Sequence, residues 1–116
     1  MLYWVAYNRK AIGTMRVEMA FNDTIVTNSG YQKSDIYQTI AAAFQKHNLR
    51  CVSSDETLSF EDNGQESDYA YMWKIILGLL KSDWFVKCAS SCTFYDDDDS
   101  KEDVLSQAWK VQKRMA

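Results

Sequence analysis

The alternation of hydrophobic and polar positions divides the chain into short strands and amphipathic helices. Residues 2–7 and 15–21 are rich in aromatic, β-branched and methionine side chains, and the polar stretch between them contains Gly13. This pattern is typical of two strands joined as an antiparallel hairpin. The segment 24–30 ends in Asn-Ser-Gly, which favours a loop.

Two segments have the spacing of helices. Over 35–47, Ile36, Ile40 and Phe44 recur every four residues, and Asn48 suits the left-handed position that ends a helix. Over 67–81 the apolar residues again share one helical face: Tyr69, Met72, Trp73, Ile76, Leu79 and Leu80. Between these helices, short strands are predicted at 49–53 and 58–60, and a polar loop with an Asn-Gly turn at 61–67.

The last third of the chain predicts a strand over 84–95, a loop over 96–99 and a helix over 101–114. Ser100 and Asp103 fit a capping box, and Val104 and Ala108 lie on the apolar stripe of that helix. The order over 15–95 is then β-α-β-β-α-β, which is the ferredoxin-like split unit of an α+β protein. We expect one domain over 1–116: an added strand and turn (1–14), the core (15–95), and an acidic loop with a terminal helix (96–116).

Composition supports a folded domain that holds itself together by its core. The chain has 116 residues, of which 47% are hydrophobic and 14% aromatic, so a disordered chain is excluded. Three cysteines are an odd number and there is one histidine, which favours reduced, buried thiols over disulfides or a zinc site. No apolar run approaches the ~18 residues of a membrane span, and the apolar start, residues 1–7, is too short for a signal-peptide core and has no basic segment before it. We therefore expect a cytoplasmic protein.

Charge is segregated along the chain although the net charge is only −3. Residues 1–50 hold six basic and three acidic residues, whereas residues 51–103 hold 13 acidic residues against four lysines. The remaining residues, 104–116, carry three basic residues and no acidic ones. A basic surface of the kind that nonspecific nucleic-acid binders use is absent. The segregation instead favours self-association or a basic partner.

The most conspicuous run is acidic and consists of Asp96, Asp97, Asp98 and Asp99. Contiguous carboxylates repel one another, so the first interpretation is a solvated loop before a helix N-terminus, whose dipole favours negative charge. The second is a partner-binding patch that also includes Glu102 and Asp103. A third, a divalent metal site, has no support from spacing, because the run matches no EF-hand pattern.

Other polar residues have both a structural and a chemical interpretation. His47 lies near a helix C-terminus, where the dipole favours it, and general acid–base catalysis is the alternative. Two groups of hydroxyl residues suit either a polar strand face or hydrogen bonds to phosphate: Ser53, Ser54 and Ser59, and Ser90, Ser91 and Thr93.

The order of these segments resembles virulence-associated protein D. Residues 17–22 (VEMAFN) resemble the opening strand of that family, which is apolar and ends in Ala-Phe-Asp. An amphipathic helix and the short strand 50–53 follow, then a second helix that ends in Leu-Leu-Lys-Ser-Asp-Trp-Phe over 79–85, and a closing strand at 92–95. The likeness covers about residues 15–105.

This resemblance implies a ferredoxin-like fold shared with small CRISPR-associated nucleases, a homodimer, and endoribonuclease activity in toxin–antitoxin systems. It also implies that the Asp closing the first strand is catalytic, with two such carboxylates holding Mg²⁺ across the dimer. Here Asn22 occupies that position and Asp23 follows. An amide is a poor Mg²⁺ ligand and no general base, so Asp23 replaces the acid only if the strand has ended or bulges.

Two functional hypotheses follow. The first is a metal-dependent endoribonuclease, or a descendant that has lost the acid, with Asp23 as the surviving carboxylate beside Asn22 and with Lys10 and Arg16 neutralising phosphate. The second is a non-enzymatic binding protein: an immunity protein, an antitoxin or a phage-encoded inhibitor of a defence complex. It would use the acidic patch and edge strands to occupy a basic surface.

Overall fold

The computed structural model describes residues 15–96, 101–108 and 110. Its strands are β1 (Arg16–Phe21), β2 (Arg50–Ser54), β3 (Leu58–Glu61), β4 (Ala89–Tyr95) and β5 (Lys101–Asp103). Its helices are α2 (Asp23–Asn28), α3 (Lys33–Gln45), α4 (Asp68–Leu80) and α5 (Asp83–Cys88), followed by the 3-10 turn η1 (Leu105–Gln107). The predicted strand 2–7 and its hairpin lie outside the described residues.

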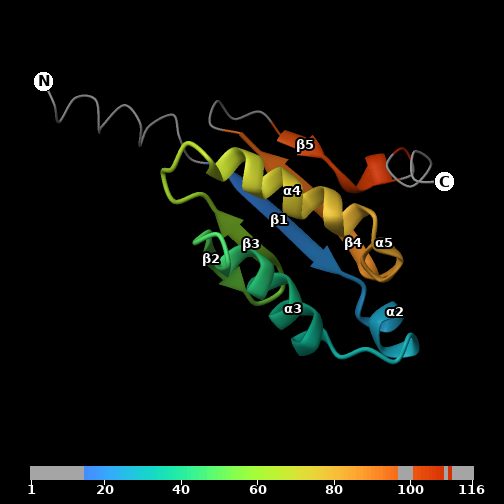
Figure 1. The fold of residues 1–116 in the computed structure, drawn as a ribbon. Coiled ribbons are helices and arrows are strands. Elements are labelled where there is room, and N and C mark those ends of the chain that lie inside the picture. The colour runs from blue at the N-terminus through green and yellow to red at the C-terminus, as the bar shows by residue number, and fades with distance from the viewer. Residues whose placement is uncertain (1–14, 97–100, 109, 111–116) are drawn as a thin grey trace, which may run out of the picture.

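The five strands form one antiparallel sheet in the order β2-β3-β1-β4-β5 (Figure 1). The first four have the order of a ferredoxin-like split unit, in which the first strand lies between the third and the fourth. The predicted α+β, ferredoxin-like fold is therefore confirmed, with β1 as the central strand. The additional strand β5 extends the sheet beyond β4.

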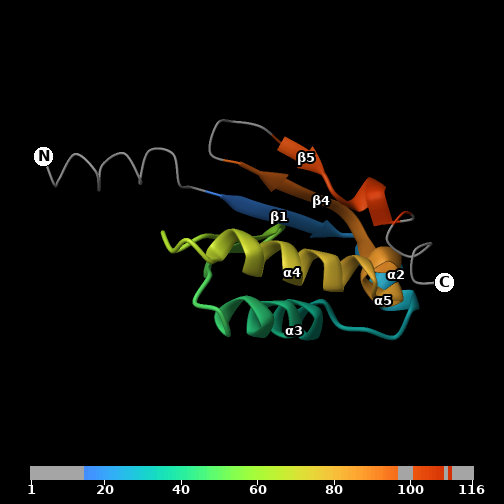
Figure 2. The ribbon, with the colours of Figure 1, turned by 45° about the horizontal axis from the view of Figure 1, so that its top comes forward.

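Both long helices cover one face of the sheet (Figure 2). Along β1, Val17, Met19 and Phe21 are buried beneath them, while the alternate residues are only half-buried on the other face. In α3 every fourth residue is buried, as the sequence pattern predicts. In α4, Met72, Ile76, Leu79 and Leu80 of the predicted stripe are buried, whereas Tyr69 is exposed. At the centre the rings of Phe44 and Phe60 stack with centroids 4.0 Å apart. Asn48 has a φ of 62°, as predicted for the end of α3.

The loop prediction for 24–30 is wrong over most of its length, because residues 23–28 form α2. The oxygen Oδ1 of Asn22 accepts a hydrogen bond from the backbone N–H of Ile25, at 3.0 Å, and so caps this short helix. Val26 is buried, which secures the helix to the core. A helix of six residues shows too little periodicity to be recognised from its sequence.

The strand prediction for 84–95 is wrong in its first half, because residues 83–88 form α5. Aromatic and β-branched residues dominate this segment and favour a strand. A helical turn nevertheless places Phe85 and Cys88, three residues apart, on one buried face. Tertiary packing therefore overrides the local preference.

The helix prediction for 101–114 is also wrong at its start, because residues 101–103 form β5. These residues pair with β4, with Lys101, Glu102 and Asp103 opposite Tyr95, Phe94 and Thr93. Val104 follows at 0% exposure, and η1 comes next. The apolar stripe of the prediction is present in part, since Val104 and Ala108 are both buried.

Among the described residues, none of the helices combines the length and apolar character that crossing a membrane requires.

Candidate binding surface at the β4–β5 edge

The predicted catalytic pair lies just beyond the end of β1. Asn22 is the cap of α2, and its backbone N–H donates to the carbonyl of Cys88 at 2.8 Å. Asp23 is the first residue of the helix, so the strand has ended before it, as its proposed role requires. Its carboxylate pairs with the ammonium of Lys33 at 3.3 Å, and the side chain is 76% exposed. Both residues thus have structural partners within the chain.

Arg16 lies at the opposite end of β1 from Asp23. The five residue steps from Arg16 to Phe21 span roughly 17 Å at ~3.3 Å per residue. Its guanidinium carbon lies 4.3 Å from the ring centroid of Tyr95, in a cation–π contact. Arg16 was predicted to neutralise an RNA phosphate beside the Asp23 carboxylate. The structure does not bring these two residues together. Lys10, the second predicted phosphate ligand, lies outside the described residues.

A metal site is not assembled from the described acids of one chain. No group of three or more His, Cys, Asp or Glu side chains in the described part is arranged to hold an ion. At the end of β1, the amide oxygen of Asn22 is occupied by Ile25 and the carboxylate of Asp23 by Lys33. Within one chain these two residues would supply one carboxylate to a Mg²⁺ ion, whose remaining ligands would be waters or phosphate oxygens.

Two of the three thiols are buried, and the histidine stacks on an aromatic ring. Cys88 and Cys92 are buried and free, as predicted, whereas Cys51 is free but exposed, which corrects the prediction for that residue. Burial raises the pKa of Cys92 to about 12, so its thiol is protonated and unreactive at neutral pH. The His47 ring stacks on that of Tyr71 at 4.0 Å.

The predicted acidic patch is described in part. Glu102 and Asp103 lie on β5, and Asp96 directly follows β4. Asp97, Asp98 and Asp99 lie outside the described residues. Glu102 accepts a hydrogen bond from the side chain of Gln107 at 2.6 Å. The described part of the patch, Asp96, Glu102 and Asp103, thus lies at the β4–β5 edge of the sheet, which makes this edge the candidate binding surface.

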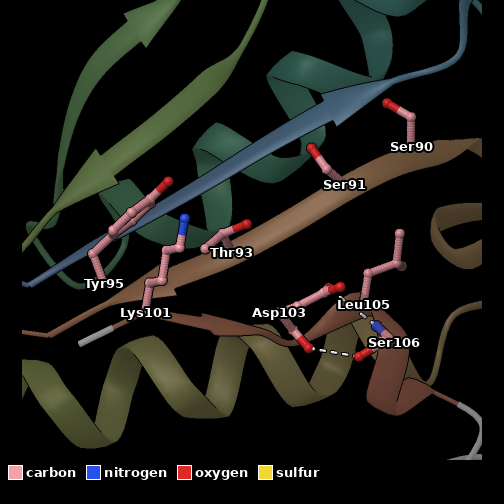
Figure 3. A pocket seen from close by; sticks show the side chains of 8 residues that line it. All are labelled: Ser90, Ser91, Thr93, Tyr95, Lys101, Asp103, Leu105 and Ser106. Atoms are coloured by element: carbon pink, nitrogen blue, oxygen red, sulfur yellow. Dashed lines mark hydrogen bonds between the residues drawn. The ribbon is translucent and has the colours of Figure 1, made fainter.

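A groove lies on the sheet face that the long helices leave uncovered, and Figure 3 shows the side chains that line it. Its volume is about 500 Å³. Four of its residues come from β4 and the others from β5 and η1: Ser90, Ser91, Thr93, Tyr95, Lys101, Asp103, Leu105 and Ser106. Asp103 is fixed by hydrogen bonds with Ser106, whose backbone N–H donates to Oδ1 and whose hydroxyl donates to the Asp103 carbonyl. The groove therefore presents hydroxyl groups, one ammonium and one carboxylate. We refer to it as the hydroxyl groove.

A second hollow, of about 240 Å³, lies on the helix side of the same edge. Three aromatic and three charged residues line it: Tyr69, Trp73, Phe94, Asp96, Lys101 and Glu102. We refer to it as the aromatic hollow. The sequence pattern assigns Tyr69 and Trp73 to the core stripe of α4, yet Tyr69 is 51% exposed. Their spacing of four residues could have indicated a shared surface, but not its position beside Phe94.

The two hollows follow from strand geometry. Successive side chains on a strand point to opposite faces, so Thr93 and Tyr95 face the hydroxyl groove while Phe94 faces the aromatic hollow. The pairing of β5 with β4 places Asp103 beside Thr93 and Glu102 beside Phe94. The exposed edge strand β5 is therefore flanked by a different cavity on each face.

No protein-family model, no curated protein and no solved structure matches this chain.

Proposed function

We propose that this chain is a non-enzymatic binding protein that docks a basic, extended segment of a partner protein along β5. The observation that carries the proposal is that β5 is an exposed strand at the edge of the sheet. All three of its residues are exposed, and within the described residues the strand pairs on one side, with β4. An exposed sheet edge offers backbone donors and acceptors that an added strand satisfies.

Charge supports a basic partner. Glu102 and Asp103 lie on the strand itself beside Lys101, and the sequence has four consecutive aspartates at 96–99, separated from the strand by Ser100. Opposite charges accelerate encounter and reject acidic competitors, although they add less to affinity than buried contacts do. Such a protein would act in conflict biology within the cytoplasm, as an immunity protein, an antitoxin or an inhibitor of a defence complex.

The test uses a fluorescent ten-residue peptide in which arginine alternates with threonine, and a counterpart with glutamate in place of arginine. We expect the basic peptide to bind, to weaken as salt rises, and to slow hydrogen exchange at the amides of β5. The double substitution Glu102→Gln and Asp103→Asn should weaken binding at least fivefold. The control pair Asp55→Asn and Glu56→Gln, which removes two exposed charges elsewhere, should leave it unchanged.

Two results would overturn the proposal. One is equal binding of the basic and acidic peptides, because charge would then play no part. The other is binding of the basic peptide without protection of the β5 amides, because the segment would then lie elsewhere on the molecule.

A second candidate is the endoribonuclease that the resemblance to virulence-associated protein D implies. It is favoured by the central position of β1 and by the exposed carboxylate of Asp23 directly after it. A homodimer, also implied, would bring two such ends together. Labelled RNA with Mg²⁺ or Mn²⁺ tests this: cleavage should occur and Asp23→Ala should abolish it, while Asp35→Ala should not. Intact RNA after incubation with the wild-type protein would eliminate this candidate.

A further inference from the structure

The aromatic hollow is built on three rings in mutual contact. The centroid of Phe94 lies 5.0 Å from that of Trp73 and 6.2 Å from that of Tyr69, and Tyr69 and Trp73 are 6.5 Å apart. Phe94 is 4% exposed and Tyr69 is 51% exposed, so the cluster extends from the core to the surface. It therefore offers ring surface to a visiting side chain at the edge of the sheet.

Charged groups line the same hollow. Asp96 and Glu102 contribute two carboxylates, and Glu102 already accepts a hydrogen bond from Gln107. Lys101 borders the hollow, but its side chain lies with Tyr95 and Thr93 on the other face of the strand (Figure 3). An apolar side chain entering here would remove carboxylates from water without replacing their hydrogen bonds, at a cost in free energy. A cation entering here would instead gain both the carboxylates and the faces of the rings.

The volume of about 240 Å³ limits the size of the occupant. Cavities that bind small molecules usually measure ~300–1,000 Å³. The aromatic hollow lies below that range and lies directly beside the exposed strand β5. These dimensions suit one side chain that projects from a neighbouring strand.

We propose that the aromatic hollow receives a single arginine side chain from the partner strand, an inference that rests on the proposed function. The planar guanidinium stacks on aromatic faces and donates several hydrogen bonds to carboxylates. The lysine ammonium is a compact and strongly hydrated charge, which gains less from flat rings. The hollow is therefore selective for arginine over lysine.

The strand geometry also predicts the neighbours of this arginine. Adjacent side chains of a paired strand point to opposite faces, so the residues before and after the arginine lie over the hydroxyl groove. That groove offers Thr93, Tyr95 and Ser106 hydroxyls beside Lys101 and Asp103. The partner segment consequently carries small polar residues on either side of its arginine.

The test compares three ten-residue threonine-rich peptides that carry one central arginine, lysine or citrulline. Citrulline has nearly the shape of arginine but no charge. We expect the arginine peptide to shift the indole N–H signal of Trp73 in the NMR spectrum and to bind at least tenfold more tightly than the citrulline peptide. The lysine peptide should be several-fold weaker than the arginine peptide.

Substitutions in the aromatic hollow test whether its residues cause the preference for arginine. Tyr69→Ala should reduce the preference for arginine over citrulline at least fivefold, and the matched control Tyr31→Ala, at another exposed tyrosine, should retain it. Glu102→Gln removes the charge at an exposed position and keeps nearly the same side-chain shape, and it should also weaken the preference. Thermal unfolding of each variant verifies that the fold is intact.

The outcomes separate this inference from the proposed function. Equal affinity for arginine and citrulline, with the β5 amides still protected, would overturn the arginine site and leave the edge-binding function standing. Retention of the preference in both Tyr69→Ala and Glu102→Gln would likewise overturn the site. Failure of every basic peptide to protect the β5 amides would overturn the proposed function and the arginine site together.

Discussion

At the scale of single residues, the position of Asn22 can serve two roles: capping a helix and supplying a catalytic carboxylate. Asparagine and aspartate cap helices about equally well, because either side chain supplies an oxygen to the first N–H groups. The amide of Asn22 therefore satisfies Ile25 as a carboxylate would. An exchange between aspartate and asparagine here leaves the capping bond possible but removes a negative charge and a potential general base.

Asp62 is a residue whose buried position disfavours the negative charge of its side chain. Its backbone N–H donates to the carbonyl of Met15 at 3.1 Å, and its Oδ1 accepts from the Met15 N–H at 3.2 Å. Burial raises the pKa of Asp62, and the nearby carboxylate of Asp68 raises it further, while backbone N–H groups of Met15 and Gly64 oppose the shift. The carboxylate is thus retained in a place that disfavours its ionised form.

This raised pKa predicts a pH dependence of stability. Between the ordinary value of 3.8 and the raised value in the folded protein, the folded state holds a proton that the unfolded state has lost. The free-energy contribution of Asp62 to folding therefore falls as pH rises through this window and stays low above it. In Asp62→Asn that fall should disappear, as urea unfolding between pH 3 and 7 would measure.

The exposed substitution Asp55→Asn serves as the control and should keep the wild-type dependence. An identical pH dependence in Asp62→Asn and the wild type would contradict the assignment.

At the scale of elements, the short helices depend on contacts rather than on their own sequence. Isolated helices of six residues are unstable in water, because nucleation costs more than so few hydrogen bonds return. α2 is secured by its cap and by buried Val26, and α5 by Phe85 and Cys88. The two helices also contact each other. They lie at the end of the sheet where β1 ends and Asn22 follows.

The cap of α2 can be tested directly. Asn22→Ala removes the acceptor for the Ile25 N–H and should lower the free energy of unfolding by about 1 kcal/mol. Asn22→Asp and Asn22→Ser keep an acceptor oxygen and should stay close to the wild type. Chemical denaturation of the four proteins at pH 7 makes the comparison. Equal loss in the alanine and serine variants would show that the cap contributes nothing.

At the scale of the whole molecule, the chain beyond β4 is part of the fold. The sequence predicts a core over 15–95 with a loop and helix appended, but Val104 and Ala108 are buried in the same core as β1 and α4. The Val104 N–H also donates to the Cys92 carbonyl at 3.0 Å. The residues that follow β5 are therefore packed against the sheet.

The burial of Val104 in the core predicts that this residue contributes measurably to the free energy of unfolding. Val104→Ala removes two buried methyl groups and should cost about 2 kcal/mol of unfolding free energy. Val52→Ala makes the same chemical change at a position that is 44% exposed, and should alter stability by less than ~0.5 kcal/mol. Denaturant unfolding of the two variants gives the comparison. Similar small losses in both would mean that β5 and η1 are only loosely attached.

The sequence pattern predicts β1, α3, α4 and the ferredoxin-like order of elements, because the buried positions of each element repeat within its own segment at the period of a strand or a helix. It also indicated the acidic character of the chain around residues 96–103. Packing against distant parts of the chain forms α2, α5 and β5, which are too short to show the period of a helix or a strand. The tertiary structure alone brought Tyr69 and Trp73 to Phe94, and separated Arg16 from Asp23, because long-range pairing places residues where local patterns carry no information.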